Sequence, residues 1–272
     1  MSVARRAAIA VLAACLLAGC GSGGGDGKSS PPATAASPSA TPTDRSPHGV
    51  LLSAKLQMDT ARRAKFSYRL GTQSATGMLF WAPKTVLVLD RLGAPERVIV
   101  LDTTAYLGGD PATAARLGGR HWEKFATAPG PAGRREVPYS AMVDRLNPMV
   151  ALTAAVAAPD PALVGEQQTA DGTFQHYRVS LTADAYTAAQ TQLSADRRAA
   201  LRAALGPGPL VLDLLLNDKD QLAEVHRTGT GPADPVDDTV RYSEFGGALS
   251  VQAPADGDTA DAGTKSLPPL AP

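Results

Sequence analysis

Cysteine is nearly absent from this chain. Of its 272 residues only Cys15 and Cys20 are cysteine, and none follows residue 20. The rest of the chain therefore has no disulfide, no thiol nucleophile and no cysteine ligand for a metal ion. A domain built there must be held together by core burial alone. Residues 49–254 are long enough for one sizeable domain of that kind.

Long hydrophobic runs are also absent from the N-terminus. The apolar run from Ala7 to Gly19 has 13 residues, whereas a membrane-spanning helix needs about 20. Two arginines and no acidic residue precede it, which is typical of a secretory signal peptide. The sequence therefore predicts a cleaved leader over residues 1–19. General secretion is favoured over twin-arginine export, although the arginine pair keeps the second route open.

The last residues of this leader resemble a bacterial lipobox, formed by Leu17, Ala18, Gly19 and Cys20. In such signals the cysteine thiol receives a diacylglycerol, and cleavage makes that cysteine the first residue of the mature protein. Cys20 is thus the predicted lipid attachment site, and two acyl chains hold a protein stably on a membrane. The alternative is an ordinary signal peptide with a chance cysteine.

Residues 21–48 contain almost nothing that a fold could bury. They consist mainly of Gly, Ser, Pro, Ala and Thr, and such a composition cannot offset the entropy lost on ordering. With the lipidated cysteine, residues 20–48 are therefore predicted to form a disordered tether. Residues 255–272 have a similar composition and are predicted to be a disordered tail.

Neither sign of charge is in large excess. The chain has 26 basic and 26 acidic residues, and loss of Arg5 and Arg6 with the leader leaves 24 against 26. A nucleic-acid-binding protein would need a concentrated basic face, so no nucleic acid partner is expected. The basic clusters at 62–65 and 197–202 are interpreted as solvated helix faces, with contact to anionic lipid headgroups as the alternative.

The pattern of residues 49–254 predicts an α+β fold. Short runs with apolar residues at every second position alternate with turn residues, which is typical of antiparallel strands. Helical periodicity is expected at four places: residues 51–64, 139–146, 149–158 and 183–205. Asn147 and Pro148 suit the N-cap and first turn of the third of these helices. Residues 240–246 and 248–254 are expected to finish the sheet.

Three stretches of this region resemble motifs of the actinobacterial LppX/LprG lipoproteins, which share the LolA/LolB fold. The first is a hairpin that carries Gly165, Glu166, Asp171, Gly172, His176 and Tyr177. The second is the hairpin around 209–228, which lacks the family's tryptophan at 214–216. The third carries Ser243, Phe245, Gly246, Ala253 and Pro254, with Glu244 in place of an aspartate.

This resemblance implies a strongly curved antiparallel β-sheet, a half-barrel, wrapped over a few α-helices with an apolar cavity between them. The cavity would take the acyl chains of lipids or glycolipids. Its predicted lining residues are Phe66, Tyr68, Met78, Phe80, Met142, Leu146, Tyr177, Leu212 and Leu214. Plain core packing is the alternative for each residue, because periodicity shows burial and not an empty volume. The missing tryptophan leaves open a narrower or closed cavity.

No arrangement of residues in the sequence supports catalysis. A G-x-S-x-G serine motif is absent, and the four histidines are not spaced as metal ligands. No enzyme activity, cofactor or metal is therefore expected.

The sequence favours a lipid-binding lipoprotein on the outer face of a bacterial cytoplasmic membrane. Transfer of the bound lipid is the further part of this hypothesis. The alternative is a non-catalytic surface interaction or scaffold protein of the same fold without an open cavity.

Overall fold

The computed structural model describes residues 44–127, 136–231 and 235–270. The predicted leader, the lipobox with Cys20 and the tether up to residue 43 lie outside the described residues. None of the helices in the described part combines the length and apolar character that crossing a bilayer requires.

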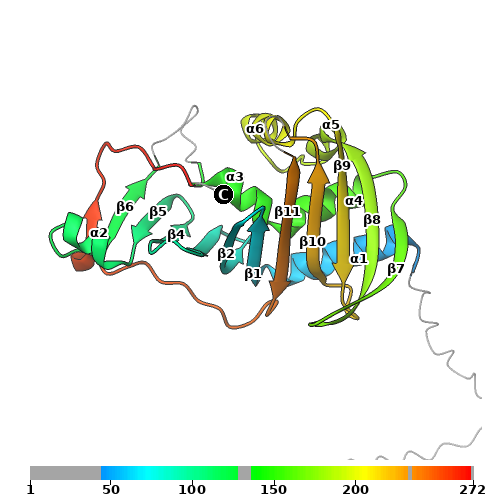
Figure 1. Cartoon of the computed structure of the whole chain (residues 1–272), viewed down its shortest axis with the longest axis horizontal. Coiled ribbons are helices and arrows are strands. Elements are labelled where there is room, and N and C mark those ends of the chain that lie inside the picture. Colours follow the sequence, from blue (N-terminus) through cyan, green and yellow to red (C-terminus); the bar gives the residue numbers. More distant parts are fainter. Residues whose placement is uncertain (1–43, 128–135, 232–234, 271–272) are drawn as a thin grey trace, which may run out of the picture. The chain divides into compact units, whose positions relative to one another are not determined.

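One open sheet of twelve strands forms the frame (Figure 1). Its order is β12-β6-β5-β4-β3-β2-β1-β11-β10-β9-β8-β7, and every neighbouring pair is antiparallel except β12 and β6. The strands are β1 (Arg63–Leu70), β2 (Gln73–Phe80), β3 (Val86–Arg91), β4 (Arg97–Leu101), β5 (Thr104–Gly108), β6 (Trp122–Ala126), β7 (Ala162–Thr169), β8 (Gly172–Thr182), β9 (Pro209–Leu216), β10 (Leu222–Gly229), β11 (Val236–Ser243) and β12 (Thr259–Asp261).

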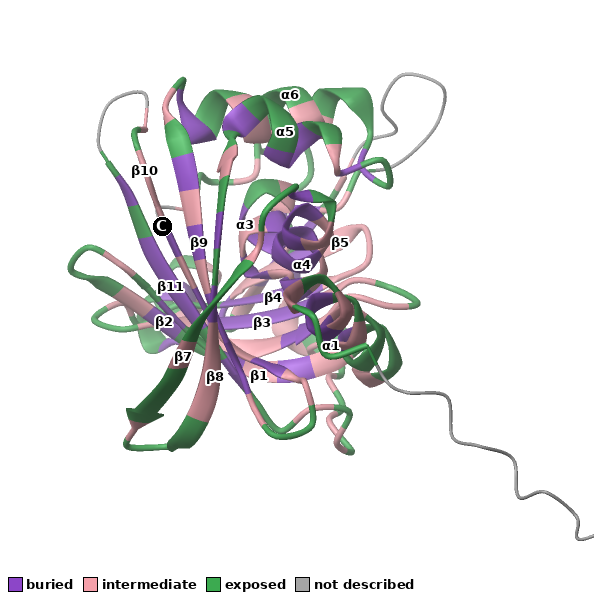
Figure 2. Ribbon diagram, turned by 90° about the vertical axis from the view of Figure 1, so that its right-hand side faces the viewer, coloured by how far each residue is buried: buried purple, intermediate pink, exposed green. Residues whose placement is uncertain are grey.

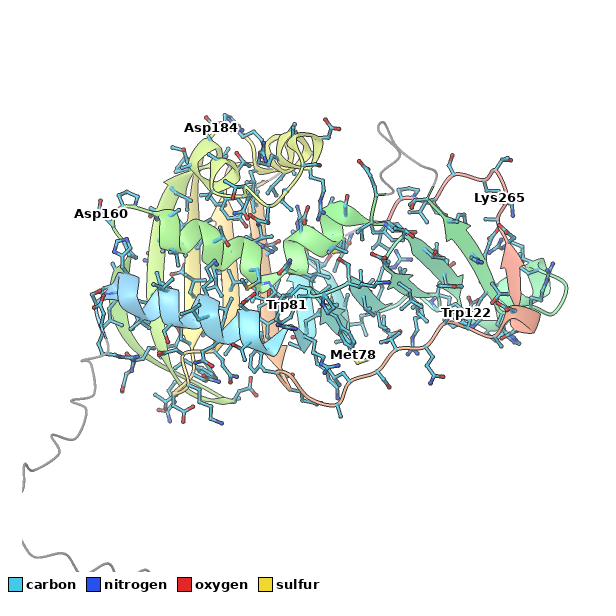
Figure 3. The ribbon with its side chains drawn as sticks, turned by 180° about the vertical axis from the view of Figure 1, so that it is seen from behind. Met78, Trp81, Trp122, Asp160, Asp184 and Lys265 are labelled. Atoms are coloured by element: carbon cyan, nitrogen blue, oxygen red, sulfur yellow. The ribbon has the colours of Figure 1, made fainter. Side chains whose placement is uncertain are left out.

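The helices lie against one face of this sheet. They are α1 (Pro47–Ala61), α2 (Pro111–Arg116), α3 (Ser140–Leu146), α4 (Pro148–Ala157), α5 (Ala183–Ala188) and α6 (Ala195–Leu205). Figure 2 shows that β7–β11 run steeply across the direction of β3 and β4, so the sheet is strongly twisted and bends around α1, α3 and α4. Seen from behind, α1 and α4 lie side by side across the sheet (Figure 3). The prediction of an α+β fold with a curved, mainly antiparallel sheet over helices is confirmed.

The core fills the space between this inner face and the helices. Alternate residues of each strand point inward, and the largest fully buried side chains include Leu51 and Met58 of α1 and Leu152 of α4. On the sheet side, Leu212 and Leu214 are also fully buried. The middle of the fold is therefore a packed apolar core.

Local capping explains where the helices begin and end. The Asn147 side chain accepts a hydrogen bond from the Met149 backbone N–H at 3.0 Å, and Pro148 occupies the first turn of α4. Asn147 also ends α3, so one residue separates the two helices. This confirms the predicted role of Asn147 and Pro148, because it depends only on residues adjacent in sequence.

The single helix predicted over residues 183–205 is wrong. The structure has two helices there, and Ser194 caps the second by accepting a hydrogen bond from the Arg197 backbone N–H at 3.3 Å. Between them Gln190 is fully buried and its side-chain amide donates to the Val150 carbonyl of α4 at 2.9 Å. Tertiary contact therefore overrides the helical propensity of the alanine-rich run.

Two expectations for the C-terminal region are also wrong. Residues 248–254 form no strand, and residues 255–270 are part of the fold. They include a 3₁₀ turn, η2 (Asp256–Asp258), and strand β12, which pairs with β6; Leu267 and Leu270 then pack against the core. The domain therefore extends to Leu270, because apolar residues too sparse to show a pattern still find a place on the inner face.

An ionic cluster fastens this segment to β6. Glu123, with a side chain 5% exposed, accepts hydrogen bonds from Lys265 at 2.5 Å and Arg116 at 2.6 Å. Burial by itself would raise the pKa of Glu123, but these two cations outweigh it and the net pKa is lowered. A lowered folded-state pKa stabilises the fold above the ordinary glutamate pKa, and that contribution is lost as pH falls through the folded value.

Glu123→Gln is therefore expected to lower the free energy of unfolding by about 1–2 kcal/mol at neutral pH. The difference from wild type should begin to shrink as the pH falls below the ordinary glutamate pKa of about 4.3, and it should vanish below the lowered folded-state pKa, where Glu123 is protonated in the folded protein as well. Urea unfolding followed by tryptophan fluorescence measures the free energy of unfolding of both proteins at each pH. A difference that does not change with pH would contradict the assigned role of the carboxylate.

Candidate functional site

Seven of the nine residues predicted to line a cavity lie on the helix side of the sheet or in α3. Of these, Leu146, Leu212 and Leu214 are fully buried, and Phe66 and Tyr177 are 4% and 3% exposed. These five belong to the packed core and line none of the inner cavities described below, although Phe66 also borders the groove on the outer face. Tyr68 and Met142 do line cavities.

Met78 and Phe80 lie on the opposite, outer face of the sheet, so the prediction that they line an inner cavity is wrong. Met78 pairs with Lys65, which alternates with the inward-facing Ala64 and Phe66. The Phe80 ring is covered by the Arg63 guanidinium, whose central carbon lies 5.3 Å from the ring centroid. In β2 the inward positions are Ala75, Gly77 and Leu79. The odd-numbered residues of this strand therefore face the helices, whereas the prediction assigned the even-numbered ones to that side.

A cavity of about 260 Å³ lies where α3 and α6 meet the ends of β10 and β11. Its apolar wall comes mainly from α6, whose small side chains leave space next to the sheet, and from Met142 of α3. Its polar wall carries five charged residues. The apolar residues are Ala141, Met142, Ala200, Leu201, Ala204, Leu205, Val236 and Leu270, and the charged residues are Asp144, Arg145, Arg197, Arg227 and Asp238.

A buried ion pair forms the sheet side of this cavity. Arg227 of β10 donates two hydrogen bonds to Asp238 of β11, at 2.7 and 3.0 Å. Their side chains are 4% and 1% exposed. Arg227 also donates to the Arg145 carbonyl at 2.8 Å and so ties the sheet to α3. The two hydrogen bonds between this guanidinium and this carboxylate let the two buried charges satisfy each other without solvent.

A second ion pair joins α3 to α6 across the cavity. Asp144 accepts two hydrogen bonds from Arg197. Burial raises the pKa of Asp144, and the Arg197 charge offsets only part of this rise. Because Leu205 is the only buried residue of α6, this contact holds a helix that has few apolar contacts of its own.

Two smaller cavities continue the space along the inner face of the sheet. One of about 250 Å³ is lined by Tyr68, Leu89 and Arg91, and it shares Met142 with the first. The other, of about 140 Å³, is lined by Arg91, Tyr139 and Leu270. Burial raises the pKa of Tyr139 to about 12, so its phenol is neutral at physiological pH. Met142 lines both the cavity of about 260 Å³ and that of about 250 Å³.

The outer face of the sheet carries a separate groove of about 590 Å³, lined by Met78, Val88, Phe174 and Leu215 among other residues. Three basic and three acidic side chains line it, and two pairs of them form ion pairs, Arg97 with Asp90 and Arg241 with Glu224; the remaining two are Lys65 and Asp171. It therefore presents no excess charge to a ligand.

The histidines give no catalytic arrangement in the described residues. His121, His176 and His226 each bond an aspartate, at 2.7, 2.6 and 2.8 Å. Glu224, two residues before His226 on β10, pairs with Arg241 at 2.5 Å. Among the described residues, no group of three histidine, cysteine or acidic side chains could hold a metal ion.

Sequence reasoning missed the charged residues of the cavity. A signal was present, since Arg227 and Asp238 stand in phase with inward apolar residues of their strands, such as Val225 and Val240. A charge at an inward position predicts a buried partner. Which partner depends on the register between β10 and β11, and this the sequence does not show.

Known proteins resemble this chain more in fold than in sequence. No family model matches the chain. It is 25% identical over 167 residues to an uncharacterized 31.2 kDa protein encoded in the rplA–rplJ intergenic region of Streptomyces griseus, a match that covers 57% of this chain and 53% of that protein. The chain thus spans about half the length of this curated relative.

Two solved structures of mycobacterial proteins are similar in fold. LprF from Mycobacterium bovis is 12% identical with a TM-score of 0.48, over 77% of this chain and 97% of that one. The Mycobacterium tuberculosis lipoprotein LppX is 7% identical with a TM-score of 0.46, over 77% and 100%. The chain is similar to the LppX/LprG lipoproteins. This is the family that the three sequence motifs resemble, and at these identities the likeness concerns the fold alone.

Proposed function

We propose that this protein is a cell-envelope lipoprotein, anchored through a diacylglyceryl group on Cys20, that binds the acyl part of a lipid or glycolipid in the cavities around α3. The observation that carries the proposal is the cavity between α3, α6 and the sheet, with an apolar wall on one side and a few convergent polar groups on the other. The lipobox and the motif resemblance support the membrane location, on the outer face of the cytoplasmic membrane.

The cavities around α3 are too small, taken one at a time, to admit a lipid chain without some movement of the protein. Cavities of about 260 and 250 Å³ each fall below the roughly 300–1,000 Å³ of typical ligand sites. Rotation of Met142 would join them into one space, because a methionine side chain is unbranched and adapts to its surroundings. The loosely packed α6 would act as the lid, since opening it exposes little apolar surface.

Transfer between membranes is the further part of this proposal. A tether on Cys20 would keep the cavity close to the bilayer, so that an acyl chain could exchange between lipid and protein at a high effective concentration.

The alternative, a surface scaffold with no open cavity, is favoured by one observation. The centre of the sheet–helix interface is solidly packed, with Leu146, Leu212 and Leu214 fully buried. The two functions differ in whether a lipid chain reaches the interior.

Photochemical capture distinguishes them. The full chain is reconstituted in vesicles that contain a phospholipid with a diazirine on its acyl chain, and cross-linked peptides are identified by mass. We expect cross-links in the cavity wall, in α3 and α6. Cross-links confined to exposed positions such as Leu52 and Leu56 of α1, which are 47% and 58% exposed, would favour the scaffold.

A matched pair of variants tests whether the acyl chain of the lipid lies within the cavity. Met142→Trp places a bulkier side chain at the wall position that the two cavities share and should reduce capture in the cavity at least tenfold. Leu56→Trp adds the same ring to an exposed helix position and should leave capture unchanged. Ala204→Phe, on the α6 wall, gives the same test if Met142→Trp does not fold. Undiminished capture in a folded, filled variant would refute this location.

A further inference from the structure

The walls of the cavity at α3 carry one more positive than negative side chain. Arg145, Arg197 and Arg227 face only two carboxylates, Asp144 and Asp238. Each carboxylate already has a guanidinium of its own, since Asp144 is bonded by Arg197 and Asp238 by Arg227. Arg145 is therefore the surplus cation.

The contacts of Arg145 confirm that it has no carboxylate to itself. Its closest carboxylate oxygen is Oδ2 of Asp238, 3.5 Å from Nε, and that oxygen already accepts a hydrogen bond from Arg227 at 3.0 Å. Its Nη1 donates to the neutral Tyr68 hydroxyl at 3.1 Å. The Arg145 side chain is 27% exposed, and no hydrogen bond of its Nη2 is recorded among the described residues.

A partly buried cation without a dedicated counter-charge is unfavourable in an apolar cavity, because it has left water without gaining a full ion pair. An anion placed beside it would gain both charge attraction and hydrogen bonds. Guanidinium groups bind phosphate and carboxylate oxygens with two parallel N–H donors. The cavity thus offers a single anion site on its α3 side.

The opposite wall has a different chemistry. Ala200, Leu201, Ala204 and Leu205 of α6 form a strip of aliphatic side chains along the same cavity. A ligand that satisfies both walls has an anionic group at one end and hydrocarbon at the other. A sugar or a small inorganic anion would match one wall only.

We infer that the ligand of this cavity is an anionic amphiphile whose phosphate or carboxylate is held by Arg145 while its hydrocarbon lies along α6. The inference rests on the proposed function, because it assigns the chemical class of lipid that the same cavity selects. Two sources share this chemistry: the phosphodiester of an acidic phospholipid and the carboxylate of a free fatty acid.

The test compares head groups at constant surface charge. Full-length protein is reconstituted in phosphatidylcholine vesicles that contain a trace of diazirine-acyl probe, either phosphatidylglycerol or phosphatidylcholine. Because the probe is a trace, both vesicles attract the protein equally. Capture in cavity peptides should be at least tenfold higher for phosphatidylglycerol. Equal capture of both probes in the cavity would overturn the inference and leave lipid binding intact, whereas no capture of either probe would overturn the proposed function itself.

Substitutions of Arg145 test whether this side chain causes the preference for phosphatidylglycerol over phosphatidylcholine. Arg145→Gln should abolish the preference for phosphatidylglycerol, and Arg145→Lys should restore part of it by returning the charge. Arg202→Gln is the matched control, since Arg202 lies on α6, the other helix of the cavity, but bonds Asp184 and the Gly206 carbonyl outside the cavity wall. A preference that persists in folded Arg145→Gln, or that disappears in Arg202→Gln, would refute the role of Arg145.

Competition separates the two sources. Unlabelled oleate and unlabelled phosphatidylglycerol are each titrated against the probe, with inorganic phosphate as the third arm. Stronger competition by oleate identifies the carboxylate, and stronger competition by phosphatidylglycerol identifies the phosphodiester. Competition by inorganic phosphate at an equal concentration would overturn the requirement for an amphiphile.

Discussion

Arg227→Met is expected to lower the free energy of unfolding by about 3–5 kcal/mol, because the buried Asp238 carboxylate loses both hydrogen bonds from Arg227 and keeps only Arg145, whose Nε lies 3.5 Å away, as a counter-charge. Asp238 is 1% exposed, so water cannot replace the lost guanidinium. The bond to the Arg145 carbonyl would be lost as well, which loosens α3. Urea unfolding measures the effect, provided that the slope of the free energy of unfolding against urea concentration is the same in both proteins.

Two controls isolate the cause. Arg241→Met removes an arginine from the outer face of the neighbouring strand, where its 61% exposed side chain pairs with Glu224, and should cost no more than about 1 kcal/mol. The double variant Arg227→Met/Asp238→Leu should recover most of the loss, because a buried ion pair can be replaced by apolar residues. A single variant as stable as wild type would show that Asp238 is compensated in another way.

Cys20→Ala is expected to abolish membrane anchoring, because no other cysteine is available at the cleavage site to carry the diacylglycerol. Both cysteines lie outside the described residues, so this prediction rests on the lipobox alone. When cells are fractionated, the variant should no longer be found in the membrane fraction that contains the wild-type protein. Mass spectrometry of the N-terminal peptide should show a thioether-linked diacylglyceryl group in the wild type only.

The other cysteine is the natural control. Cys15 lies five residues upstream in the same apolar run, and Cys15→Ala should be processed and anchored as the wild type is. A diacylglyceryl group that persists in Cys20→Ala would contradict attachment at Cys20, and a wild type without any diacylglyceryl group would make the ordinary signal peptide the better interpretation.

Features that depend on neighbouring residues were predictable from the sequence. The start of α4 at Asn147 and Pro148 follows from the side chain that caps it, and most strands follow from apolar residues at every second position. These signals need no knowledge of distant parts of the chain. The α+β class and the mainly antiparallel sheet follow from them, because short turns join most consecutive strands.

The lining of the cavity was not predictable in the same way. In residues 77–80 apolar side chains occupy both faces of β2, so a period of two does not reveal which face is inside. The answer comes from the pairing of Met78 with Lys65 and of Gly77 with Phe66, which turns Met78 and Phe80 outward. The break at Ser194 is similar, since the burial of Gln190 against α4 decides it.

The sequence by itself determined the class of fold and the capped start of α4, and it predicts lipid attachment at Cys20, because each rests on contacts or chemistry within a few residues. Only the tertiary structure decided the cavity, the pairing of Arg227 with Asp238 and the place of Leu270 beside α3. These depend on strand register and on packing between segments far apart in the chain, where the free energy is shared among many contacts and no short stretch carries it.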